Sequence, residues 1–224
     1  METLAAADLA KMLRAAAENV IANEPILTKA DQAIGDGDHG IGMARGFGAA
    51  LLALDQQEGE QSPGKVFAVF GTAILSNAGG ASGAVFGTFF RGVGKALTSE
   101  LVDLKALAAA FDQGAKAVMA RGNAKPGDKT MLDALAPAVD AINHAQTEAP
   151  AKAFRIAAAA ARTGAEATSN MIAGTGRAKM LGQRSIGFID PGALTMTLVF
   201  EGMASCLNKL GPSEFATPNH DANS

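Results

Sequence analysis

Three aspartates and a histidine lie within one glycine-rich segment, Asp31-Gln-Ala-Ile-Gly-Asp36-Gly-Asp38-His39. Carboxylate oxygens are hard ligands that suit Mg²⁺ or Ca²⁺. The intervening glycines permit unusual backbone angles, so the three carboxylates can converge on one ion. The segment is not an EF-hand loop, because the glycine at loop position 6 and the glutamate at position 12 are missing. It therefore predicts a divalent-cation site. The alternative is a solvated acidic turn whose aspartates cap the next helix.

The acidic segment leads directly into a predicted helix that carries Met43 and Phe47. A helix N-terminus offers free N–H groups and a positive dipole, and both favour a bound phosphate. A cation site next to a phosphate site indicates a Mg²⁺-nucleotide site. His39, at the junction, has three open roles: contacting phosphate, orienting a carboxylate, or donating a hydrogen bond at the helix start.

Three other loops contain polar or basic residues before a predicted helix. The small-residue turn 77–83 is either a backbone nest for an anion, with the Ser82 hydroxyl added, or a glycine C-cap followed by a serine N-cap. In the loop 121–131, Asp128 is either an N-cap or part of a phosphate-facing loop. The basic stretch 177–185 either closes over phosphates or is solubilising. A P-loop is excluded, since Gly-x-x-x-x-Gly-Lys-Ser/Thr is absent.

Apolar residues recur at helical spacing along most of the chain, with capping residues and glycines between the segments. Most connections are short, which favours antiparallel neighbours in an up-and-down arrangement. Residues 25–39 and 172–189 are expected to be long functional loops. We expect residues 1–210 to form a single helical nucleotide-binding domain and 211–224 a flexible polar tail. The eight predicted helices cover about 9–20, 43–54, 63–78, 82–97, 104–118, 128–142, 151–171 and 191–210.

The composition narrows the class of protein. Of the 224 residues, 48% are hydrophobic, which is ample for a core, and the chain is rich in alanine, the strongest helix former. A net charge of −3 gives no basic footprint, so nucleic acid is not an expected partner. Cys206 is the single cysteine, which excludes a disulfide framework. No apolar run reaches about 18 residues and no signal-peptide order is present. These features predict an all-α cytoplasmic protein that does not enter a membrane.

Four motifs together resemble the L subunit of dihydroxyacetone kinase: GDGDHG, GGASG followed by FGTFF, RGNAKPGDKTMLD and GRAKMLGQRSIGFIDPGA. The similarity covers about residues 4–205. It implies a barrel of eight antiparallel helices that holds ATP or ADP and two Mg²⁺ at one end. It implies that Asp31, Asp36 and Asp38 are the metal ligands and that Arg177 is the catalytic residue. The implied nucleotide-binding residues are His39, Gly40, Ile41, Gly42, Ala81, Ser82, Gly122, Met131, Arg177, Asp190, Pro191 and Gly192.

The resemblance also implies a reaction and partners. The terminal phosphate of Mg-ATP would pass to dihydroxyacetone or a four-carbon ketose held on a separate K subunit, in glycerol metabolism, and the chain would act only with that partner. In the alternative version, ADP stays bound and is re-phosphorylated in place by a phosphotransferase-system protein. A regulatory binding module and a metal-dependent phosphohydrolase are rival classes, and a homodimer is left open.

One position departs from the family pattern. Many relatives have Asn where this chain has Gly42. Without the side-chain amide, a contact to phosphate or to the metal shell is lost, and only backbone N–H groups remain to make such contacts. Looser phosphate contacts favour the version in which ADP exchanges for ATP in each cycle.

Overall fold

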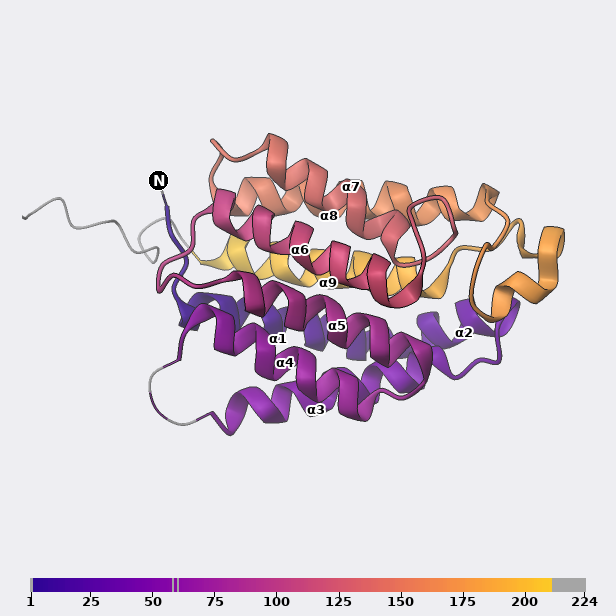
Figure 1. Cartoon of the computed structure of the whole chain (residues 1–224), viewed down its shortest axis with the longest axis horizontal. Coiled ribbons are helices and arrows are strands. Elements are labelled where there is room, and N and C mark those ends of the chain that lie inside the picture. Colours follow the sequence, from indigo (N-terminus) through magenta and orange to yellow (C-terminus); the bar gives the residue numbers. More distant parts are fainter. Residues whose placement is uncertain (1, 58, 60, 211–224) are drawn as a thin grey trace, which may run out of the picture.

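The computed structural model describes residues 2–57, 59 and 61–210, so the predicted tail 211–224 lies outside the described residues. The described part is all-α, as the sequence predicts (Figure 1). None of its helices is long and apolar enough to cross a membrane. The α-helices are α1 (Ala6–Ala22), α2 (Glu24–Ile34), α3 (His39–Asp55), α4 (Pro63–Asn77), α5 (Gly80–Ala96), α6 (Leu104–Gly122), α7 (Leu132–His144), α8 (Pro150–Ala167) and α9 (Pro191–Lys209); the 3-10 helices are η1 (Thr168–Asn170) and η2 (Arg177–Ser185).

The long helices pack in a closed order. From α3 to α9 each helix packs on the next along the chain, while α1 packs on both α3 and α9. The helix axes run along the long dimension of the molecule (Figure 1). The short helix α2 packs mainly on α3, outside this order. Leu4 and Val102 form an isolated antiparallel bridge near the opposite end from α2, with N–O distances of 2.8 and 3.0 Å.

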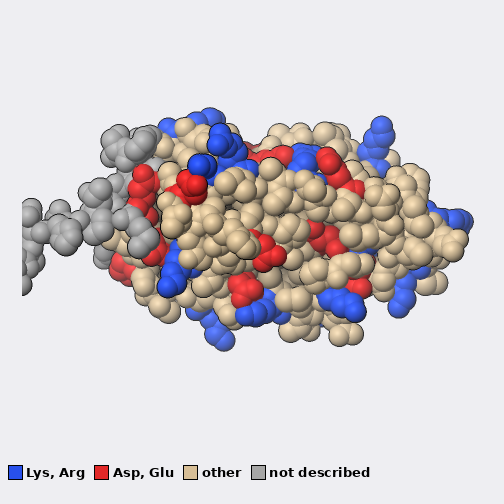
Figure 2. All heavy atoms as spheres, turned by 90° about the horizontal axis from the view of Figure 1, so that it is seen from above, with Lys and Arg blue, Asp and Glu red and all other residues tan. Residues whose placement is uncertain are grey.

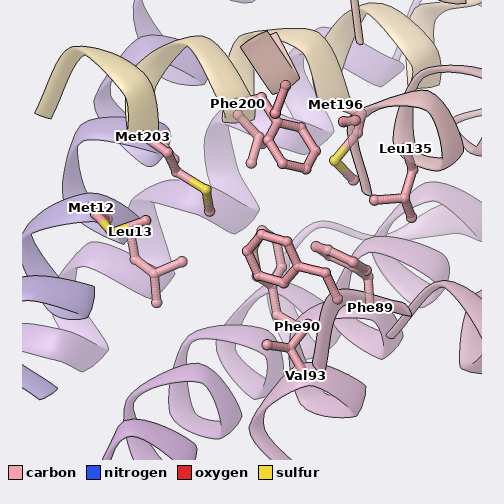
Figure 3. Packing of buried hydrophobic residues seen from close by; sticks show 14 of the residues in the cluster. Met12, Leu13, Phe89, Phe90, Val93, Leu135, Met196, Phe200 and Met203 are labelled. Atoms are coloured by element: carbon pink, nitrogen blue, oxygen red, sulfur yellow. The ribbon is translucent and has the colours of Figure 1, made fainter. Parts of the chain in front are cut away.

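Phenylalanines fill the interior between the helices. Phe90 of α5 contacts four other rings, and its centroid lies 4.9 Å from that of Phe70 of α4. Phe111 of α6 contacts both Phe154 of α8 and Phe200 of α9. Figure 3 shows side chains from α1, α5, α7 and α9 pointing toward one another in this core. This core joins all the long helices.

The structure corrects the expectation that residues 25–39 form a loop. Helix α2 occupies Glu24–Ile34 and begins with Pro25 in its first turn. Its buried residues are Leu27, Asp31 and Ile34, so an aspartate stands where the helical pattern requires an apolar residue. That substitution hides the helix from a periodicity analysis. The predicted loop 172–189 likewise contains a helical segment, η2.

Two predicted helix starts are wrong. Ser82 is not an N-cap, because α5 already begins at Gly80, after Gly79 with φ +78°. Helix α7 begins at Leu132 and not at Asp128. The Asp128 carboxylate accepts a hydrogen bond from Lys125 N at 2.9 Å within the preceding loop. Two smaller differences are that α1 begins at Ala6, before the predicted start near residue 9, and that α8 ends at Ala167 before η1.

Three helices begin at a capping side chain. The side chains of Ser62, Asp103 and Asp190 each accept a hydrogen bond from the backbone N–H three residues later. The two of these caps that precede a proline start α4 and α9, as expected for proline in the first turn.

Gly202 and Gly48 offer a test of how closely the helices pack. A Cβ atom at Gly202 of α9 would lie 2.5 Å from Ala15 O and 2.6 Å from Ala16 Cα of α1, whereas at Gly48 of α3 nothing lies within 4 Å. We expect Gly202→Ala to lower the free energy of unfolding by about 1–3 kcal/mol, the usual cost of overpacking. Gly48→Ala should raise it by about 0.5–1 kcal/mol through helix propensity. Urea denaturation measures both, and equal effects would contradict this packing.

Candidate functional site

One end of the molecule holds a cavity of about 480 Å³. The start of α3, the start of α5, the end of α6, the loop before α7, the start of α9 and the beginning of η2 line it. These elements lie at the end of the molecule opposite Leu4 (Figure 1). Of the residues that the sequence analysis assigns to a site, all but two line the cavity. The exceptions are Gly40, which is buried against Thr28 of α2, and Asp36, which lies in the acidic cluster beside the cavity.

The three aspartates converge as the sequence predicts. One carboxylate oxygen from each of Asp31, Asp36 and Asp38 lies within 4.8 Å of the others. Asp31 is buried and accepts a hydrogen bond from His39 N at 3.1 Å, which ties α2 to the start of α3. A side chain at position 35 would overlap the Asp31 carboxylate, so Gly35 is required there. Three hard oxygen donors at this spacing fit a Mg²⁺ ion.

Arg177 of η2 contacts the same cluster. Its guanidinium forms an ion pair with Asp36 and lies 3.4 Å from the Asp38 carboxylate. The three side chains are 46–70% exposed. The basic segment is therefore held over the acidic cluster at the cavity mouth.

His39 joins three helices beneath the cavity. Its Nδ1 lies 3.0 Å from Ser82 Oγ of α5 and its Nε2 lies 2.8 Å from Thr195 Oγ1 of α9. The Thr195 hydroxyl donates its proton to Pro191 O, so it accepts from Nε2–H, and Nδ1 then accepts from Ser82. Burial lowers the pKa of His39 to about 4, although Asp31 and the Pro191 backbone raise it. Both ring nitrogens are engaged within the protein, so the imidazole is neutral and fixed.

The turn between α4 and α5 faces the start of α3. Arg45 donates to Asn77 O at 2.6 Å and to Ala78 O at 2.7 Å, which holds the turn in place. A Cβ at Gly42 would lie 2.9 Å from Ala78 O. Gly42 therefore allows α3 to approach the turn closely. The first N–H groups of α3 and α5 have no partner within their helices, and residues of both helix starts line the cavity.

Lys129 and Asp190 line another part of the cavity. Lys129 is 2% exposed, has a left-handed backbone with φ +60°, and donates from Nζ to Thr168 O at 2.6 Å and to Phe188 O. Burial lowers the pKa of Lys129, opposed by Asp190 and Asp133. Burial also raises the pKa of Asp190 to about 7, while the Ala193 N–H and Lys129 lower it and Asp133 raises it.

Lys129 and Arg45 belong to the site without any local sequence pattern that predicts a role for them. A lysine in a glycine-containing loop is ordinarily exposed, and its partners Thr168 and Phe188 are 39 and 59 residues away. The partners of Arg45 are 32 and 33 residues away. No local pattern links residues at such separations.

The fold and the site together define a class of protein. It is an all-α protein in which an acidic cluster and two helix N-termini surround one cavity. The chain belongs to the DAK2 domain family, whose model matches residues 33–205. This result confirms the family resemblance seen in the sequence motifs.

Two similar proteins are separate subunits of nearly the same length. The chain is 37% identical over 186 residues to the ADP-binding subunit DhaL of PEP-dependent dihydroxyacetone kinase 1 from Listeria innocua. The aligned region spans 83% of this chain and 89% of that subunit. The chain is 38% identical over 181 residues to the ADP-binding subunit DhaL of the PEP-dependent dihydroxyacetone kinase from Escherichia coli, spanning 80% and 86%.

Other similar proteins are much longer. The chain is 36% identical to the L-erythrulose 1-kinase of Mycolicibacterium smegmatis but spans only 33% of it. The crystal structure of the dihydroxyacetone kinase from C. freundii in complex with AMP-PNP and Mg²⁺ matches with a TM-score of 0.69 at 27% identity. That match covers 92% of this chain and 35% of the kinase. All four relatives are kinases or kinase subunits by name.

The environment of His39 leads to a spectroscopic prediction. Because burial holds its pKa near 4 instead of 6.5, the ring should stay neutral, with the proton on Nε2, as the pH falls from 8 to about 5.5. Ring ¹⁵N chemical shifts measure both the charge and the tautomer. In urea-unfolded protein the same ring should titrate near its ordinary value of about 6.5. A folded-state midpoint near 6.5 would contradict the buried hydrogen-bonded arrangement.

Proposed function

We propose that this chain is the nucleotide-binding subunit of a dihydroxyacetone-type kinase. The observation that carries the proposal is the convergence of three carboxylates and two helix N-termini on one cavity. The two kinds of group have complementary tasks, because carboxylates bind divalent cations and helix N-termini bind phosphates. A Mg²⁺-nucleotide is the ligand that requires both at once.

In this proposal Asp31, Asp36 and Asp38 hold the metal. Mg²⁺ would neutralise phosphate charge and orient the transferred group. The residues His39–Gly42 of α3 and Ala81 and Ser82 of α5 surround the phosphates in this proposal. The N–H of His39 already donates to Asp31 and that of Gly42 to Asp38 O, so phosphate oxygens are bound by the N–H groups of Ile41, Ala81 and Ser82. Arg177 reaches the same region from η2 and stabilises charge on the transferred group.

The remaining cavity surface would hold the nucleoside. Gly122, Met131 and the turn Asp190-Pro191-Gly192 line this part of the cavity, together with apolar residues such as Val85 and Val118. Apolar walls with a few polar groups are typical of small-molecule sites.

We further propose that the nucleotide is ADP that stays bound between turnovers. The sequence-based preference for exchange with ATP rests on Gly42, but Gly42 also has a packing role against Ala78. The relatives named as separate ADP-binding subunits match over 86–89% of their length, whereas the L-erythrulose 1-kinase matches over 33%. The similarity therefore extends over nearly the whole of the separate ADP-binding subunits. Re-phosphorylation by a phosphotransferase-system protein is the corresponding route.

The ketose would be presented by a separate K subunit that docks at the cavity mouth. Apolar side chains are exposed around η2, including Met180 at 86%, with Ile172, Ile186 and Phe188 beside it. This segment carries Arg177, Lys179 and Arg184 and no acidic residue. On the face shown in Figure 2, basic side chains predominate at that end of the molecule. An acceptor-bearing partner with an apolar and acidic surface would fit here.

Nucleotide content tests the proposal directly. We expect the protein purified by gel filtration, then denatured, to release close to one ADP per chain together with Mg²⁺. Nucleotide in the supernatant is quantified by ion-exchange chromatography and metal by atomic absorption. An empty protein that binds Mg-ATP reversibly would replace the ADP-retaining version with the exchanging one. An empty protein that cannot be loaded with either nucleotide would contradict the proposed function.

Removing one carboxylate charge tests the metal site. We expect Asp36→Asn to weaken Mg²⁺-dependent ADP binding by at least about tenfold, since even outer-shell partners of metal ligands contribute that much. Far-UV circular dichroism should be unchanged, because Asp36 lies outside the helices and is partly exposed. Isothermal titration calorimetry measures the affinity. The matched control is Asp112→Asn, which alters an exposed ion pair with Lys116 on α6. Retained affinity in Asp36→Asn would exclude this cluster as the metal site.

A further inference from the structure

Lys129 is the only lysine or arginine that is buried in the described part of the chain. Placing its ammonium there requires compensation, because burial disfavours the charged form. Two backbone carbonyls supply it, Thr168 O and Phe188 O. The carboxylates of Asp190 and Asp133 add favourable charge. An ammonium that donates to two carbonyls in the protein interior stays in one place.

The backbone at Lys129 is also unusual. A left-handed conformation is rare for residues other than glycine and costs about 1 kcal/mol or more. The loop is held in it from both sides, since Asp133 accepts hydrogen bonds from Gly127 N and from Thr130 N at 2.7 Å. This conformation directs the Lys129 side chain into the protein and not into solvent. The strained backbone conformation at Lys129 therefore occurs together with an ammonium that is held at one position in the protein interior.

The two carbonyls belong to segments that form the rest of the cavity wall. Thr168 follows the last residue of α8, so the ammonium lies at the negative end of that helix dipole. The Thr168 hydroxyl accepts a hydrogen bond from Asp190 N at 2.9 Å. Phe188 precedes Asp190 by two residues. One ammonium thus fixes the loop before α7 relative to the turn that begins α9.

These two segments touch at the cavity itself. A Cβ at Gly192 would lie 3.4 Å from Met131 N and 3.0 Å from the Asp190 carboxylate. Lys129, Met131 and Gly192 all line the cavity. A small change in the separation of the segments would therefore change the width of the site.

We propose that Lys129 is a positioning residue for the nucleotide: its ammonium sets the separation between the loop before α7 and the Asp190–Gly192 turn, and nucleotide affinity depends on that separation. The proposal rests on the proposed nucleotide-binding function. Lys129 acts through these segments and not on the metal, because the acidic cluster is built from α2 and the segment before α3.

The experiment compares binding of two probes, Mg-ADP and Mn²⁺ alone, to full-length, nucleotide-free protein. Lys129→Met keeps the length of the side chain and removes the charge and its hydrogen bonds. We expect it to weaken Mg-ADP binding by at least about tenfold, which is about 1.4 kcal/mol, and to leave Mn²⁺ binding unchanged. Titration calorimetry measures the first affinity and electron paramagnetic resonance of Mn²⁺ the second. Lys125→Met, an exposed lysine in the same loop, should change neither.

A purely structural role for Lys129 would give a different pattern. General loosening of that end of the molecule would weaken Mg-ADP and Mn²⁺ binding together, and that result would overturn the proposal. Wild-type Mg-ADP affinity in Lys129→Met would also overturn it. If Lys129→Met does not fold, Lys129→Gln decides, since it retains a hydrogen-bond donor without the charge. Wild-type Mg-ADP affinity in Lys129→Gln would then overturn the proposal, and a selective loss would support it. Failure of the unmodified protein to bind Mg-ADP is a separate result that counts against the proposed function itself.

Discussion

The close packing of Ala78 between α3 and α5 is the constraint on which the site depends. Gly46 of α3 and Gly83 of α5 face the Ala78 methyl group, and a Cβ at either would lie 2.5–2.8 Å from it. Gly42 faces the Ala78 carbonyl in the same way. Helix backbones approach this closely only where side chains are absent. The starts of α3 and α5 therefore lie side by side, and their free N–H groups face one cavity.

The electrostatics of the cavity follow from the same arrangement. Acidic groups lie at the mouth, at Asp36 and Asp38, where Arg177 balances them. In another part of the cavity lining, the Lys129 side chain is buried and its ammonium donates to Thr168 O and Phe188 O. The exposed pair is screened by water and exchanges partners at little cost. The Lys129 ammonium is costly to displace, because it would lose these two acceptors in the protein interior. The contacts of Arg177 can therefore change easily, whereas those of Lys129 are fixed.

The sequence predicts the parts of this site that local patterns encode. Glycine-rich segments, caps and proline starts identify the cavity loops and the start of α9, because each depends on residues within three or four positions of one another. Helix α2 escapes detection because Asp31 occupies a buried helical position. Lys129 escapes because its hydrogen-bond partners are on η1 and the segment before α9. Tertiary contacts of single polar side chains leave no periodic signal.

Arg177 contacts two of the carboxylates that would also bind a divalent cation. A divalent cation bound to Asp31, Asp36 and Asp38 would compete with the guanidinium for the last two carboxylates, and the cation carries twice the charge. Binding of the metal would then free Arg177 to contact phosphate. Since such coupling is reciprocal, any ligand that draws Arg177 away from the carboxylates would strengthen metal binding by the same factor. The segment η2, which carries Arg177 and the exposed Met180, would then lose this ion pair with the acidic cluster. The surface offered to a partner would therefore depend on what the cavity holds.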